Sequence, residues 1–181
     1  MADSKENIIE FTILFNRYKK KVFNYVLRMT NNTELSEDLV QNAFLKLYEN
    51  LNNIRNKSSI PFWLFKTARN EVYTYFRDNK RKPEYNAKEL NNELEFKSTM
   101  NIESEFELKE MKDLLLNTLG NLPHDQKEIF IMREYGGLSY REISSVLEIN
   151  IDLVKSRLYK TRQKLMKIFH SKSKSEVFGD E

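Results

Sequence analysis

Cysteine is absent from this 181-residue chain, and histidine occurs only twice. Without cysteine the chain has no disulfides, thiolate metal sites or cysteine nucleophiles, which fits a reducing cytoplasm, where we expect the protein to reside. The two histidines, His124 and His170, lie far apart, and no acidic cluster is patterned around them. We therefore expect no metal site, no catalytic residues, no enzymatic activity and no cofactor.

Glycine and proline are also scarce, with 4 and 3 residues, and strand-like alternation is rare. A hydrophobic content of 40% is enough to build a core. Together these features predict an all-α protein. No apolar run approaches the roughly 20 residues that span a bilayer, and the N-terminus lacks the apolar core of a signal peptide.

Charge divides the chain into segments. Residues 66–82 are mainly basic, 84–110 hold eight acidic against three basic side chains, and 153–174 hold eight basic and no acidic ones. We predict two small helical domains, 8–82 and 108–170, joined by an acidic flexible linker, 83–107, and followed by a tail, 171–181. The linker is either a solubilising spacer or a segment whose charge mimics nucleic acid and enters a basic channel of a partner.

The segment from Leu138 to Leu165 predicts a helix-turn-helix, a motif whose second helix lies in the DNA major groove. Ser139 and Glu142 have the spacing of a capping box, and Asn150 is a good N-cap for the next helix. The apolar stripes are Ile143, Val146 and Leu147 in the first helix and Ile151, Val154, Leu158 and Leu165 in the second. The side chains expected to face outward are Lys155, Ser156, Tyr159, Lys160 and Lys164. The alternative is a basic surface helix that contacts only solvent.

Three helices are expected in the first domain. Apolar residues from Phe11 to Met29 recur at helical spacing, and a turn at 31–33 precedes a second helix that we expect Ser36 to cap. A polar loop, 52–61, leads to a third helix that ends in a basic cluster at 80–82. Aromatic and cationic side chains interleave on this third helix, as on surfaces that stack bases and neutralise phosphates of a single strand. Aromatic residues at helical spacing are also typical of a core.

Three motifs in order resemble the extracytoplasmic-function group of bacterial RNA polymerase sigma factors. They are SEDLVQNAFLKLYEN (36–50), SSIPFWLFKTARNEVYTYFR (58–77), and the segment 122–165, which contains the helix-turn-helix. The resemblance covers nearly the whole chain apart from the first residues, the linker and the tail. Asn42, Thr74 and Glu148 depart from the family pattern, which commonly has an acidic residue, Asp and Gly there.

The resemblance implies a protein that binds core RNA polymerase and directs it to a subset of promoters. The minus-thirty-five element would be read as duplex and the minus-ten element as melted strand. An anti-sigma factor is a further partner that the resemblance implies, and no small-molecule substrate is expected.

Site residues follow from these motifs. The minus-thirty-five contacts are expected from Tyr140, Arg141, Lys155, Ser156, Arg157, Tyr159 and Lys160. The minus-ten contacts are expected from Asn56, Lys57, Ser58, Ser59, Phe62, Trp63, Lys66, Arg69, Asn70, Tyr73 and Arg77. The polymerase contacts are expected from Asp38, Leu39, Gln41, Asn42, Leu45 and Tyr48.

Two other functions compete with this interpretation. An ordinary helix-turn-helix regulator would have a sensing or dimerising N-terminal domain, which has no need of a basic, aromatic helix after a polar loop. A nucleic-acid enzyme would need a carboxylate cluster to hold a metal ion, and the acidic residues concentrate in the linker instead.

Overall fold

The structure is a computed structural model that describes residues 2–79, 111 and 114–177, with side chains over 7–79, 111 and 114–171. The predicted acidic linker, 83–107, lies outside the described residues. No strand occurs in the described part of the chain, so the all-α prediction is confirmed. None of the described helices is long and apolar enough to cross a membrane.

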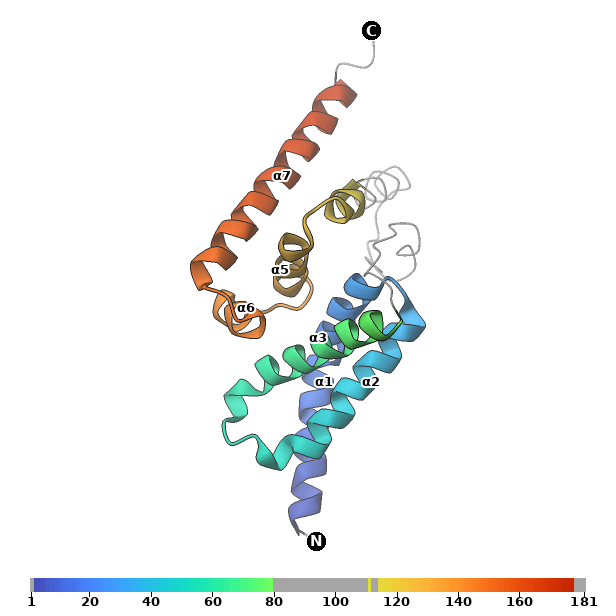
Figure 1. Ribbon diagram of the computed structural model, residues 1–181, viewed down its shortest axis with the longest axis vertical. Helices are drawn as coiled ribbons and strands as arrows, with labels where there is room; N and C mark the ends of the chain where they lie inside the picture. The colour runs from blue at the N-terminus through green and yellow to red at the C-terminus, as the bar shows by residue number, and fades with distance from the viewer. Residues whose placement is uncertain (1, 80–110, 112–113, 178–181) are drawn as a thin grey trace.

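The N-terminal domain consists of α1 (Ala2–Thr30), α2 (Thr33–Asn50) and α3 (Ile60–Asp78). Two short 3-10 turns, Leu51–Asn53 and Lys57–Ser59, connect α2 to α3. Figure 1 shows α3 crossing the pair formed by α1 and α2. The apolar faces of all three helices are buried together. The largest fully buried side chains of this domain are Tyr25, Phe44, Phe65, Leu47, Leu51, Ile60 and Leu64.

The start of α2 differs from the prediction. Asn32, not Ser36, is the N-cap, and its side chain accepts a 2.8 Å hydrogen bond from the backbone N–H of Leu35. Ser36 lies one turn inside the helix, is fully buried, and donates from its hydroxyl to the backbone carbonyl of Asn32 at 2.6 Å. Asn31 makes the predicted turn in the left-handed region, with φ of 54°, a conformation that asparagine tolerates better than most residues.

The C-terminal domain consists of a helical segment over 114–120, α5 (His124–Glu134), α6 (Tyr140–Leu147) and α7 (Ile151–Val177). The predicted capping box is present: the Ser139 side chain accepts from the Glu142 N–H, and the Glu142 carboxylate accepts from the Ser139 N–H. Asn150 accepts a 2.8 Å hydrogen bond from the N–H of Asp152 at the start of α7. The helix α7 continues to Val177, past the domain end expected at 170.

The two domains lie against each other, with α3 beside α6 and α1 beside α5. Their buried apolar residues form one contiguous cluster. The C-terminal end of α7 extends away from this body, opposite the N-terminal end of α1 (Figure 1). This arrangement decides which of the candidate site residues are accessible.

Candidate nucleic-acid and polymerase interfaces

The exposed face of α7 carries four of the expected duplex contacts. Lys155, Ser156, Tyr159 and Lys160 are all exposed, and Tyr159 has 65% of its surface accessible. Val154 and Leu158 on the opposite face are buried, as expected from their spacing. Lys155 pairs with Asp152 one turn earlier at 2.9 Å, an exposed ion pair of little energetic weight. These four side chains are therefore accessible to a nucleic acid.

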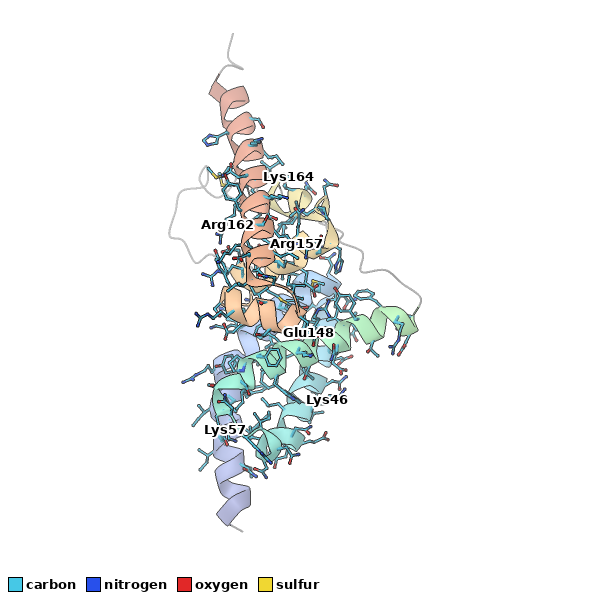
Figure 2. All side chains as sticks on the ribbon, turned by 60° about the vertical axis from the view of Figure 1, so that its left-hand side comes forward. Lys46, Lys57, Glu148, Arg157, Arg162 and Lys164 are labelled. Carbon is cyan, nitrogen blue, oxygen red and sulfur yellow. The ribbon has the colours of Figure 1, made fainter. Side chains whose placement is uncertain are left out.

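The other expected duplex contacts are more constrained. Arg157 is partly buried and forms an ion pair with Asp125 at the start of α5. The Tyr140 ring lies under the guanidinium of Arg133, and its hydroxyl is 3.3 Å from Arg162. Figure 2 shows Arg157 and Arg162 on α7, where they tie this helix to the rest of its domain. Arg141 is exposed on α6.

The helix α7 is held against α6 by the turn between them. Glu148 has φ of 56° and ψ of 41°, the left-handed conformation expected where the family commonly has glycine. The Ser144 hydroxyl donates to the carbonyl of Ile149 at 2.6 Å, which fixes the crossing of the two helices. The turn thus retains the geometry of the motif without the glycine.

The expected minus-ten contacts in the polar loop, 56–59, lie in a tight turn. The Asn56 side chain accepts hydrogen bonds from the N–H and the hydroxyl of Ser58, and the Ser59 hydroxyl donates to the Asn56 carbonyl. Lys57 pairs with Glu10 of α1 at 2.9 Å and also donates to the Leu51 carbonyl. Asn56, Lys57 and Ser58 are exposed and Ser59 is partly buried, and several of their polar groups are already engaged within the protein.

The expected strand-binding residues on α3 fall into two groups. Asn70 and Arg77 are exposed, with Arg77 paired to the neighbouring Asp78. Phe62, Trp63, Lys66, Arg69 and Tyr73 are partly buried, and Phe62 and Trp63 pack against the core. The partly buried group includes the residues that meet the C-terminal domain.

The outer face of α2 carries five of the six expected polymerase contacts. These exposed residues are Asp38, Gln41, Asn42, Leu45 and Tyr48, and Leu45 has 52% of its surface accessible. Leu39 was wrongly assigned to this face: it is 6% exposed and belongs to the core, because its position on α2 faces the other helices.

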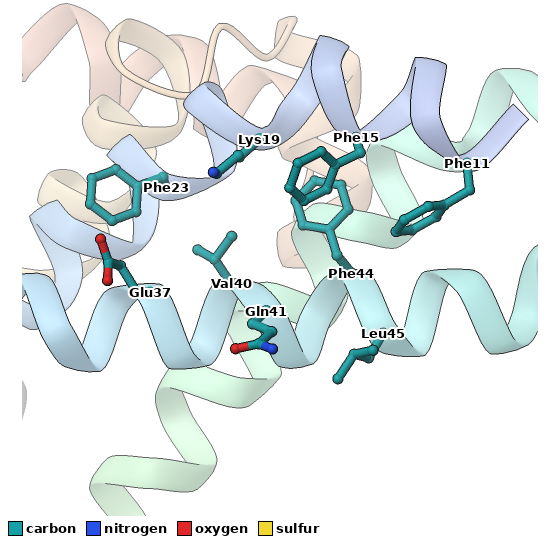
Figure 3. A pocket seen from close by; sticks show the side chains of 9 residues that line it. All are labelled: Phe11, Phe15, Lys19, Phe23, Glu37, Val40, Gln41, Phe44 and Leu45. Atoms are coloured by element: carbon teal, nitrogen blue, oxygen red, sulfur yellow. The ribbon is translucent and has the colours of Figure 1, made fainter. Parts of the chain in front are cut away.

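An apolar groove lies beside this face. Figure 3 shows it between α1 and α2, with Phe11, Phe15 and Phe44 forming its aromatic wall. Its volume is about 590 Å³, and Gln41 and Leu45 line its edge. The groove extends the exposed face of α2, so a partner helix could bury both surfaces at once.

Glu128 is a central residue that the sequence analysis did not select. It lies on α5, its side chain is 4% exposed, and its carboxylate receives donors from the N-terminal domain. Arg69 donates through Nε at 2.9 Å and Nη2 at 3.3 Å, while the hydroxyls of Tyr25 and Tyr73 donate at 3.0 and 3.1 Å. The sequence offered one signal for it: a single acidic residue directly before the apolar run 129–132. A carboxylate that is buried with such a run needs hydrogen-bond partners.

The side chains that donate to Glu128 have raised pKa values. Burial, followed by the nearby Glu128 charge, raises the pKa of Tyr25 and of Tyr73 well above its usual range. Burial alone would lower the pKa of Arg69, but the hydrogen bond and charge of Glu128 outweigh it, so the pKa is raised. All three donors therefore keep their protons near neutral pH.

Two family models match this chain. Residues 14–82 match sigma-70 region 2, and residues 112–165 match sigma-70 region 4. The first match covers the helices with the candidate polymerase and strand contacts, and the second covers the helix-turn-helix.

Named relatives agree with these matches. The chain is 29% identical over 159 residues to the ECF RNA polymerase sigma-E factor of Escherichia coli strain K12, covering 84% of this chain and 83% of the relative. The corresponding protein of Haemophilus influenzae is 27% identical over 159 residues, with 84% of both chains covered.

Two solved structures share the fold. RpoE in complex with the anti-sigma factor NepR from Bartonella quintana has a TM-score of 0.66 at 19% identity, covering 89% of this chain and 97% of that one. CnrH in complex with the cytosolic domain of CnrY has a TM-score of 0.62 at 19% identity, covering 89% and 88%.

Proposed function

Since this chain belongs to the extracytoplasmic-function group of RNA polymerase sigma factors, which initiate transcription at specific promoters, we propose that it reads its two promoter elements in different states. The C-terminal domain reads the minus-thirty-five element as duplex. The N-terminal domain binds core polymerase and captures the minus-ten element as a melted strand. The domain limits that we propose are 8–82 and 108–170, with 83–107 as the connecting linker and 171–181 as the tail.

The observation that carries this proposal is the exposed polar face at the start of α7. Lys155, Ser156 and Tyr159 project from the first three turns of a helix that a capped, shorter helix holds in place. The N-terminal residues of a recognition helix are those that reach base edges in the major groove. Lysine and serine can hydrogen-bond to bases or to phosphates, and we expect exposed Arg141 on α6 to reach phosphates or bases.

Strand capture is assigned to the 56–60 turn and α3. Asn56, Lys57, Ser58 and Ser59 supply polar atoms in the turn before α3, and the aromatic and cationic residues of α3 follow directly. Flipping a base out of the stack costs a few kcal/mol, so the receiving site needs shaped hydrogen-bond partners rather than charge alone.

Polymerase binding is assigned to the exposed face of α2 and the neighbouring groove, with Asp38, Gln41, Asn42, Leu45 and Tyr48 as contacts. An apolar groove that is continuous with exposed Leu45 is typical of a protein–protein contact. Because one of the solved neighbours is bound to an anti-sigma factor, we infer that this chain also has an anti-sigma partner.

Reconstitution with core RNA polymerase tests the function. The purified chain is added to core enzyme, genomic DNA is transcribed, and the start sites are mapped. We expect a small set of starts that share two upstream elements and that vanish without the chain. Starts that are independent of the chain would contradict the proposal.

A further inference from the structure

An apolar side chain lies among the polar groups at the start of α7. Leu153 has 40% of its surface exposed, whereas the neighbouring Val154 is fully buried. Leu153 belongs neither to the hydrophobic core nor to the partly buried apolar residues that pack against it. Its side chain carries no charge and no hydrogen-bonding group, so it adds nothing to the phosphate contacts that its neighbours can make.

Leu153 shares a face of α7 with two residues assigned to the minus-thirty-five element. Ser156 follows it by three positions and Lys160 by seven, and side chains at this spacing lie along one side of a helix. All three side chains are exposed. Leu153 is the nearest of them to the N-terminal end of α7, and the N-terminal residues of a recognition helix are those that reach base edges.

The backbone at Leu153 is held in a fixed position. Its N–H donates to the carbonyl of Asn150 at 3.0 Å, and the Asn150 side chain accepts from the N–H of Asp152. The hydrogen bond from the Ser144 hydroxyl to the Ile149 carbonyl ties this end of α7 to α6. A leucine held in this way presents its methyl groups from a rigid backbone, as a contact to one small group of a base requires.

The major groove offers one apolar group to such a side chain. All four bases present hydrogen-bond donors or acceptors there, and thymine adds its C5 methyl group. Leucine can neither donate nor accept, so against polar base atoms it would displace water without replacing the hydrogen bonds. Single exposed leucines are common on protein surfaces. On this face of α7, however, a leucine can favour one base over another through the thymine methyl group.

We propose that Leu153 determines specificity in the minus-thirty-five site by contacting the C5 methyl group of one thymine. This inference rests on the proposed function, because it takes α7 as the helix that reads the duplex. Ser156 and Lys160 supply hydrogen bonds and charge on the same face, and Leu153 adds a preference for thymine over cytosine at one base pair. Burial of one methyl-sized group corresponds to about a three- to fivefold gain in affinity.

Deoxyuridine tests the contact, because it differs from thymidine only by the missing methyl group. Promoter duplexes are prepared from a start site mapped with this protein, and each thymine of the minus-thirty-five element, on either strand, is replaced singly by deoxyuridine. Competition binding measures the affinity of the complex with core polymerase for each duplex. In the wild type we expect one of these replacements to weaken binding by about three- to fivefold.

Variants show whether Leu153 is the side chain responsible. Leu153→Ala should bind the unmodified duplex about three- to fivefold more weakly than the wild type and should no longer respond to deoxyuridine at that position. Leu153→Met keeps an apolar side chain of similar size and should keep the response. The matched control is Met166→Ala, which removes an exposed apolar side chain further along α7 and should respond to deoxyuridine like the wild type.

Transcription from a promoter library gives a second readout. The complex with Leu153→Ala should lose the preference for thymine at the base pair that deoxyuridine identifies, and it should keep the preferences at the other positions of the element. The response to deoxyuridine is a ratio of two affinities of one protein, so a change in the stability of a variant does not alter it.

The outcomes separate this inference from the proposed function. Equal affinity of the wild type for all the deoxyuridine duplexes, or an equal response in the wild type and Leu153→Ala, would overturn the methyl contact while polymerase-dependent transcription remained. A minus-thirty-five element without thymine would overturn it as well. The absence of start sites that depend on the chain would instead contradict the proposed function, on which this inference rests.

Discussion

At the scale of single residues, Lys127 links stability to pH. It is 6% exposed, and burial lowers the pKa of its ammonium group to about 8. Between about pH 8 and the usual lysine pKa, the unfolded chain binds a proton that the folded chain releases, so the free energy of unfolding rises with pH. Below pH 8 both states are protonated and this contribution is constant. The wild type should therefore gain about 1–2 kcal/mol relative to Lys127→Met between pH 7.5 and 10, after allowance for partial hydration of the side chain.

Urea unfolding of both proteins at several pH values in this window measures the effect. Lys160→Met, which changes an exposed lysine on α7, is the control and should show no such trend. A constant difference between wild type and Lys127→Met across the window would mean that the pKa of Lys127 is not lowered.

Residues whose role depends on nearby sequence were predictable, and those that depend on tertiary contacts were not. Ser139 and Glu142 stand three residues apart, and their capping box follows from helix geometry. Leu39 was misassigned because the resemblance to the family motif placed it among the polymerase contacts, whereas its side chain packs in the core. Glu128 was missed because its partners Tyr25 and Arg69 lie 103 and 59 positions away.

At the scale of elements, substitutions on α7 should show whether its lysines contact bases or phosphates. Lys155→Ala and Lys160→Ala should each weaken binding to the minus-thirty-five element by about 1–3 kcal/mol and alter sequence preference if the lysines read bases. If they contact only phosphate, the loss should be similar on all sequences, and the salt slope should fall by about one unit per contact.

Binding of the polymerase complex to a promoter library at two salt concentrations separates these cases. Lys167→Ala, an exposed lysine further along α7, is the control and should leave sequence preference unchanged. If neither substitution changed affinity or sequence preference, α7 would be a basic surface helix that contacts only solvent.

The two faces of α2 should respond differently to the same substitution. Leu45→Ala removes an exposed side chain, so it should weaken association with core polymerase while changing the free energy of unfolding by less than about 0.5 kcal/mol. Gln41→Ala should act in the same direction. Leu47→Ala on the buried face should instead cost about 2–5 kcal/mol of stability. Pull-down titrations and thermal unfolding measure both quantities, and a large stability loss in Leu45→Ala with unchanged association would show that the face is assigned wrongly.

Element boundaries show the same division between local and long-range information. The capped starts of α6 and α7 agree with the sequence, because the cap side chain and its acceptor positions are neighbours in the chain. The start of α2 does not, because both Asn32 and Ser36 are suitable caps and only the packing of Ser36 against Thr30 decides between them. The continuation of α7 to Val177 could not be predicted, since 171–177 carries no apolar stripe.

At the scale of the whole molecule, the two basic surfaces belong to two domains that lie against each other. In the structure the helix assigned to the strand faces the C-terminal domain, through Arg69 and Glu128. Two modest binding surfaces reach high combined affinity only when both can engage at once. The sequence predicted the two domains and their order, but it could not predict that they contact each other, because no local pattern encodes a contact between distant helices.

The free chain should consequently bind duplex promoter DNA weakly and with little sequence preference, whereas the complex with core polymerase should initiate at defined sites. Fluorescence anisotropy with a promoter fragment and with a scrambled fragment of equal length, each with and without core enzyme, measures the difference. We expect the ratio of the two affinities to be near one for the free chain and to rise at least about tenfold in the complex, since each tenfold step corresponds to only about 1.4 kcal/mol of added contact. Raising the salt concentration should weaken the binding of the free chain to both fragments alike, because that binding is dominated by phosphate contacts. Tight, sequence-specific binding by the free chain would contradict this prediction and would favour an ordinary helix-turn-helix regulator that recognises an operator on its own.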